Sequence, residues 1–74
     1  MNASKQEIRK YMRQEVVDHI DWRTLEVNAT TLAEDACRHF QDYEEDDSID
    51  QTYYDIAYEV AIQKEKELGA NDQT

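Results

Sequence analysis

The chain has 74 residues, with 18 Asp and Glu side chains against 8 Lys and Arg, so its formal net charge at pH 7 is −10. A chain of this length forms one domain with a thin core, and its single cysteine excludes an intramolecular disulfide framework. The negative charge disfavours direct binding to DNA, RNA or an anionic membrane and predicts partners with basic surfaces. The sequence shows no apolar leader and no window near the ~20 apolar residues of a membrane span, so we expect a cytoplasmic protein.

The first expected element is a helix over residues 4–21. Ser4 followed by Glu7 is a capping box, in which two side chains satisfy backbone N–H groups that the first helical turn leaves open. Apolar residues then recur at spacings of three and four up to Ile20, which is typical of a helix with one buried stripe.

Residues 21–27 lose this periodicity and are expected to form a connection, because a short strand there would have no neighbour to pair with. The apolar side chains of Leu25 and Val27 should fold back on the core. Trp22 is also expected to be buried, since so small a core needs its one large indole ring. An exposed Trp22 would instead be the leading anchor of an interface.

A second helix is expected over residues 29–43. Three residues compete as its N-cap, namely Asn28, Thr30 and Thr31. Small residues in its apolar stripe should let a neighbouring helix approach closely. The helix should stop at the acidic run of residues 44–47, because negative charges near a helix C-terminus oppose the helix macrodipole.

A third helix is expected over residues 49–68, where Ser48 and Gln51 have the capping-box spacing. The chain contains no proline, and no alternating apolar run interrupts the helical pattern. These observations predict an all-α fold, a small antiparallel three-helix bundle. The single helical domain is expected to cover residues 1–70, with a frayed tail at residues 71–74.

The most unusual feature is the segment 42–50, which carries six carboxylates in nine positions. A calcium loop of the EF-hand type needs glycine at its sixth position and glutamate at its twelfth. Counted from Asp46, those positions hold Gln51 and Ala57, so the calcium pattern fails. The two histidines and the cysteine also lack the spacing of a metal motif. We therefore expect no metal and no cofactor.

The acidic segment favours nucleic-acid mimicry, in which carboxylates on a rigid surface occupy a groove that normally neutralises phosphates. Exposed tyrosines among the acids would support such a surface, since tyrosine is common in binding interfaces. The predicted partner-binding residues are Glu34, Asp35, Asp42, Tyr43, Glu44, Glu45, Asp46, Asp47, Asp50, Tyr54, Asp55, Tyr58 and Glu59.

No family motif is present, but in size and charge the chain resembles the small acidic proteins by which phages block host nucleases, restriction enzymes or CRISPR complexes. By this analogy we expect a non-enzymatic inhibitor or regulator that binds a basic, nucleic-acid-handling protein. An enzyme is not expected, because the sequence offers no convergent nucleophile, base and oxyanion donors. His19, His39 and Cys37 each stand without a second catalytic or ligating residue at a suitable spacing.

Two alternatives remain open. The chain could be an adaptor, an antitoxin-like protein or a complex subunit that binds through an apolar patch around Trp22, Leu25 and Tyr54. In that case the negative charge would serve only solubility or adaptation to salt. A homodimer is also conceivable, because the first 14 residues carry four cations against one acid and oppose the acidic remainder of the chain.

Overall fold

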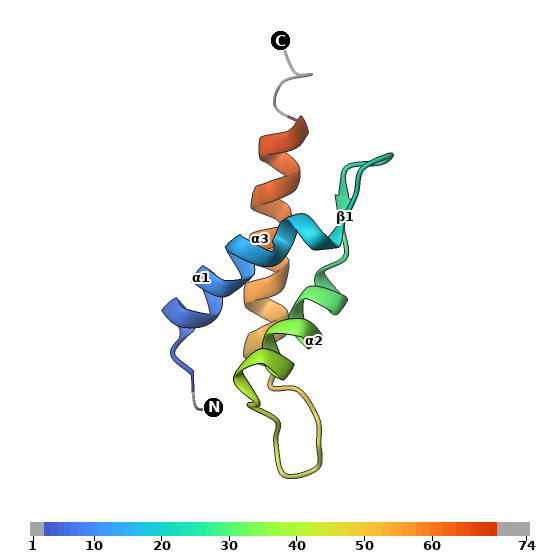
Figure 1. Ribbon diagram of the computed structural model, residues 1–74. Coiled ribbons are helices and arrows are strands. Elements are labelled where there is room, and N and C mark those ends of the chain that lie inside the picture. Colours follow the sequence, from blue (N-terminus) through green and yellow to red (C-terminus); the bar gives the residue numbers. More distant parts are fainter. Residues whose placement is uncertain (1–2, 70–74) are drawn as a thin grey trace.

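The computed structural model describes residues 3–69, which fold mainly into helices (Figure 1). The elements in chain order are α1 (Lys5–Glu15), the 3-10 helix η1 (Val16–His19), β1 (Ile20–Asp21), β2 (Glu26–Val27), α2 (Ala29–Phe40) and α3 (Gln51–Gly69). The expected all-α three-helix bundle is therefore wrong: three α-helices are present, and a small two-stranded antiparallel sheet accompanies them. The tail expected at residues 71–74 lies outside the described part of the chain.

The first correction concerns the connection after the first helix, which is a β-hairpin. β1 pairs with β2 in antiparallel register, with Ile20 opposite Val27. The pairing partner that the sequence argument could not find lies only a few residues further along the chain. Asp21 builds the turn between the strands, because its carboxylate accepts a hydrogen bond from the backbone N–H of Arg23 at 2.9 Å and its carbonyl accepts one from Leu25 at 2.6 Å.

The first two helices end earlier than expected. Ser4 caps α1 through its hydroxyl, as predicted, but the α-helix stops at Glu15 and the chain tightens into η1 before it enters the hairpin. α2 stops at Phe40 because Gln41 adopts the left-handed conformation, with φ 51°. The N–H of Asp42 then bonds to the carbonyl of Cys37, which is the Schellman pattern of a helix end.

The structure shows which of the candidate residues cap the other two helices. Asn28 caps α2, because its side-chain oxygen accepts a hydrogen bond from the N–H of Thr31. Asp50, and not Ser48, accepts a hydrogen bond from the N–H of Thr52 at 2.8 Å in the first turn of α3. The hydroxyl of Ser48 points back into the preceding loop.

The core lies where the three helix stripes meet, and α2 and α3 share the most extensive contact. It contains Ala3, Ile8, Met12, Val16, Leu32, Ala33, Ala36, Cys37, Tyr53, Ile56, Ala57 and Val60. Cys37 is fully buried in this core, and burial raises the pKa of its thiol. Within residues 3–69, no helix is both long and apolar enough to cross a membrane.

Trp22 is the second correction, because it lies in the hairpin turn and 61% of its surface is exposed. Tyr53, which is fully buried, supplies the large aromatic ring of the core instead. The hairpin projects from the helices beside the C-terminal half of α3 (Figure 1). A backbone N–H of β2, that of Val27, donates to the Glu65 carboxylate of α3 at 2.8 Å and ties the hairpin to the helix.

Replacement of Trp22 by alanine should therefore change the free energy of unfolding by less than about 0.5 kcal/mol, as for other exposed side chains. A buried tryptophan would cost about 3–5 kcal/mol on truncation. Urea denaturation followed by circular dichroism measures the difference. A loss above about 2 kcal/mol would show that the indole belongs to the core.

Candidate functional site

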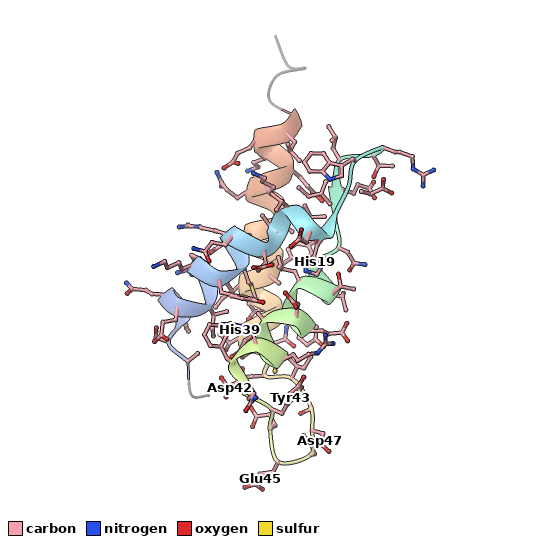
Figure 2. All side chains as sticks on the ribbon, viewed as in Figure 1. His19, His39, Asp42, Tyr43, Glu45 and Asp47 are labelled. Atoms are coloured by element: carbon pink, nitrogen blue, oxygen red, sulfur yellow. The ribbon has the colours of Figure 1, made fainter. Side chains whose placement is uncertain are left out.

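The segment between α2 and α3 is an ordered loop that displays carboxylates. We call residues 43–50 the acidic loop. Its two sides approach each other as an isolated antiparallel bridge between Tyr43 and Ile49, closed by a hydrogen bond from the N–H of Glu44 to the carbonyl of Ser48 at 2.9 Å. All four side chains from 44 to 47 are exposed. Glu45 and Asp47 point outward at the end of the molecule (Figure 2).

Local hydrogen bonds hold the tip of the acidic loop. The carboxylate of Asp46 accepts hydrogen bonds from both the N–H and the hydroxyl of Ser48, at 3.1 and 2.6 Å. Asp47 adopts the left-handed conformation, with φ 64°, which aspartate tolerates better than most residues. The loop therefore presents its acids from a fixed backbone.

The carboxyls of the acidic loop crowd one another. A hydrogen bond with the Asp50 carboxyl, followed by its negative charge, raises the pKa of Glu44 above its usual 4.5. The hydrogen bonds from Ser48 lower the pKa of Asp46, and those from Thr52 lower the pKa of Asp50.

Asp42 does not belong to the displayed surface, although the sequence placed it there. It is 5% exposed, and its Oδ2 accepts a hydrogen bond from the hydroxyl of Tyr53 at 2.8 Å. The N–H of Ala3 donates to the same oxygen at 3.5 Å, and the thiol of Cys37 donates to the Asp42 carbonyl at 3.3 Å. Asp42 thus joins the N-terminal segment, the end of α2 and α3, which is a structural role.

Two further predicted residues are occupied by contacts between helices. The hydroxyl of Tyr11 donates to Asp35 at 3.1 Å, and burial together with this bond raises the pKa of Tyr11 to about 12. Glu59 pairs with Arg9 at 2.6 Å across α1 and α3. Asp35 is half-buried, whereas the Glu59 side chain remains 57% exposed despite its ion pair.

The remaining predicted residues extend the surface along the outer faces of α2 and α3. Glu34, Asp55 and Tyr58 are exposed, and Tyr58 shows 64% of its surface. Tyr43 in the loop is 46% exposed, whereas Tyr54 is half-buried and packs against the core. Asp50 is half-buried at the start of α3. The structure therefore gathers residues 43–47 at one end and leaves the other members spread along the two helices.

One arrangement that sequence reasoning missed looks like a catalytic triad. His19 Nδ1 lies 3.0 Å from the Thr31 hydroxyl, and His19 Nε2 lies 3.7 Å from the Asp35 carboxylate. Thr31, however, donates its own proton to the carbonyl of Asn28 at 3.1 Å, so it cannot pass that proton to the histidine. The group serves to fasten η1 to α2. In the sequence, the only sign of this contact was that Thr31 and Asp35 lie four residues apart, which places them on the same face of a helix.

A second missed feature is a groove of about 750 Å³ between α1 and α3. It is lined by Arg9, Arg13, Val16, Glu59, Val60, Gln63, Lys64 and Glu67. The signal in the sequence was the set of basic residues in the first 14 positions, but their position against α3 was not visible there. We call this feature the basic groove.

Comparisons with protein families, curated proteins and solved structures find no match for this chain. Among the described residues, no group of three His, Cys, Asp or Glu side chains is placed to hold a metal ion.

Proposed function

We propose that this protein is a non-enzymatic inhibitor or regulator that engages a basic, nucleic-acid-handling protein in the cytoplasm by mimicry of nucleic acid. The observation that carries the proposal is the ordered acidic loop, which holds Glu44, Glu45, Asp46 and Asp47 exposed at one end of the molecule. Small acidic phage proteins block host restriction or CRISPR complexes by this class of activity. For this chain the proposal is supported by the charge and the geometry of the acidic loop.

The physical basis is the similarity of charge density between the loop and a nucleic-acid strand. Residues 44–47 carry four exposed carboxylates in consecutive positions, and a DNA strand likewise carries one negative charge on every nucleotide. A groove that gains affinity by neutralising phosphates gains it likewise from a run of carboxylates. Because the loop backbone is already ordered by internal hydrogen bonds, little conformational entropy is lost on binding.

The test compares two variants that carry the same net charge. Glu44→Gln, Glu45→Gln and Asp47→Asn together remove three of the five carboxylates of the acidic loop, and this combination is called the loop variant. It keeps Asp46, which holds the loop, and it places asparagine at the left-handed position 47. The acid control removes three exposed charges elsewhere, by Glu7→Gln, Asp18→Asn and Glu26→Gln.

Wild-type protein is immobilised and used to capture partners from a lysate of the source cells, and the captured protein is then purified. Its dissociation constant should rise on the order of 100-fold for the loop variant, as for the loss of several phosphate contacts, and stay near the wild-type value for the acid control. Single-stranded DNA or RNA should displace the captured protein. Equal affinity of the two variants, with no displacement by nucleic acid, would refute mimicry.

The adaptor hypothesis gains one specific observation, the exposure of Trp22 on the ordered hairpin. Leu25 is half-buried and Tyr54 packs against the core, so the apolar patch is narrower than the sequence predicted. A partner that binds through Trp22 should be retained in about 1 M salt, where the Debye length is only about 3 Å, and should be lost after Trp22→Ala. That result would replace mimicry by adaptor function.

A further inference from the structure

The basic groove collects cations from two helices. Arg9 and Arg13 line it from α1, and Lys64 lines it from α3. Arg9 is paired with Glu59 at 2.6 Å and Lys64 with Glu67 at 3.5 Å. Arg13 is exposed and makes no ion pair with any residue from 3 to 69. The groove thus keeps one cation available for an anionic ligand.

The positive surface continues beyond the groove onto the outer face of α1. Lys10 joins Arg9 and Arg13 in an adjoining depression that is also lined by Gln6 and Gln14. No carboxylate from residues 3–69 lines this depression. The two hollows together form the basic surface of a chain whose formal net charge is −10.

The acidic loop and the basic groove lie at different places along α3. The loop enters α3 at Gln51, while the residues of α3 that line the groove run from Glu59 to Glu67. At 1.5 Å per residue these lie about 12 to 24 Å along the helix from the loop. The loop extends beyond the ends of α2 and α3, away from the crossing of α1 and α3 (Figure 1). A molecule therefore cannot fill its own groove with its own ordered loop.

We infer that the basic groove binds the acidic loop of a second copy of this chain, head to tail. Arg13 gains a carboxylate partner, and Glu44 gains a cation that relieves its crowding with Asp50. Because the two surfaces differ, the contact is heterologous, and repetition builds either an open chain of copies or a closed ring. A loop held in a groove is hidden from any other basic partner. The inference goes beyond the proposed function, since self-association is measured on the purified protein alone.

The association should be strongest at an intermediate salt concentration. At about 0.01 M salt the Debye length is near 30 Å, so two copies with ten negative charges each repel over their whole length. At about 0.15 M it is near 8 Å, which screens the distant charges but leaves those in contact. At about 1 M even the contacting charges are screened. Association through an apolar patch would show no such loss at high salt.

The experiment is a complementation between two variants in sedimentation equilibrium. The loop variant keeps the groove but lacks three of the five loop carboxylates. The groove variant, Arg9→Gln with Lys10→Gln and Arg13→Gln, keeps the loop but lacks the three cations that α1 contributes to the basic surface. Each variant alone should sediment as a single chain. Its constant for self-association should be lower than that of the wild type by at least on the order of tenfold. An equimolar mixture should form a complex of two chains that grows no further, because its remaining loop lacks three carboxylates and its remaining groove lacks the cations of α1.

The controls change the same number of charges elsewhere. The acid control matches the loop variant, and Lys5→Gln with Arg23→Gln and Arg38→Gln matches the groove variant. Both should self-associate like the wild type, whose average mass should exceed that of one chain at about 0.15 M salt and rise with concentration. Helical circular dichroism checks that each variant is folded. Arg13→Gln alone is the milder second variant.

A wild-type protein that remains a single chain at every salt and concentration would overturn the inference. The same holds if the loop and groove variants associate as strongly as the wild type, or if their mixture stays monomeric while the wild type associates. Failure of the proposed function appears separately, as the absence of a captured nucleic-acid-binding partner. The two results are independent because the sedimentation experiment contains no partner.

Discussion

Replacement of Asp42 by alanine should lower the free energy of unfolding by about 3 kcal/mol. The substitution removes a charge-assisted hydrogen bond and leaves the hydroxyl of Tyr53, whose ring is fully buried, without this acceptor. It also removes the acceptor for the N–H of Ala3. A chain of 74 residues has a total stability of only about 4–11 kcal/mol, so this single carboxylate carries a large share of it.

Chemical denaturation of a small series measures this contribution. Asp42→Asn keeps a side-chain oxygen for Tyr53 and should lose less than Asp42→Ala. Tyr53→Phe removes the donor, and the double variant Asp42→Ala with Tyr53→Phe should lose less than the sum of its parts, because the two side chains interact. Asp55→Ala, at an exposed carboxylate on α3, is the matched control. If Asp42→Ala proved as mild as Asp55→Ala, the structural role of Asp42 would be wrong.

The second large effect is a loss of stability in alkaline solution. Burial, followed by the hydrogen bond to Asp42, raises the pKa of Tyr53 far above its usual 10.0. Burial also raises the pKa of Tyr11 to about 12 and that of the Cys37 thiol above 9.0. The unfolded chain therefore releases these protons at lower pH than the folded protein does. Folding is favoured fully below the unfolded pKa values, and that advantage is lost as the pH rises through the folded ones.

Each such group contributes a slope of at most about 1.4 kcal/mol per pH unit between its two pKa values. Tyr11 should contribute less than Tyr53, because its side chain is only partly buried and water screens it. Urea midpoints measured from neutral pH to about pH 12 should fall steadily above pH 9, and Tyr53→Phe should flatten the decline. Tyr43→Phe, at an exposed ring, is the control. A midpoint that is constant over this range would contradict the burial of these groups.

Helical periodicity predicted the three helices, and local chemistry predicted some of their ends. The Ser4 cap and the apolar stripes depend on residues three or four apart, which a sequence displays directly. The end of α2 was missed because Gln41, not a glycine, adopts the left-handed conformation. The hairpin was missed because its strands are two residues long and are supported by the turn at Asp21 and by Glu65 of a distant helix.

The exposed acidic segment was predictable as a region, but the exposure of its individual residues was not. Asp42 and Asp46 are both aspartates in the same acidic run, yet one is buried and the other is exposed. The difference arises from the hydroxyl of Tyr53, eleven positions away, which bonds to Asp42. Tyr53 is also the large aromatic residue of the core, a role that was expected for Trp22 because of its size. Ion pairs between helices, such as that of Glu59 with Arg9, also depend on the fold. They leave no pattern among neighbouring residues of the sequence.

The spread of contacts along the chain also determines how the fold assembles. The most extensive helix packing joins α2 and α3, which are consecutive and are linked only by residues 41–50. Closing so short a link costs little chain entropy, so this helix pair forms readily and offers a surface on which α1 docks. With no proline and a single cysteine, neither prolyl isomerisation nor internal disulfide exchange slows refolding. We therefore expect refolding without the slow phases that these two processes cause.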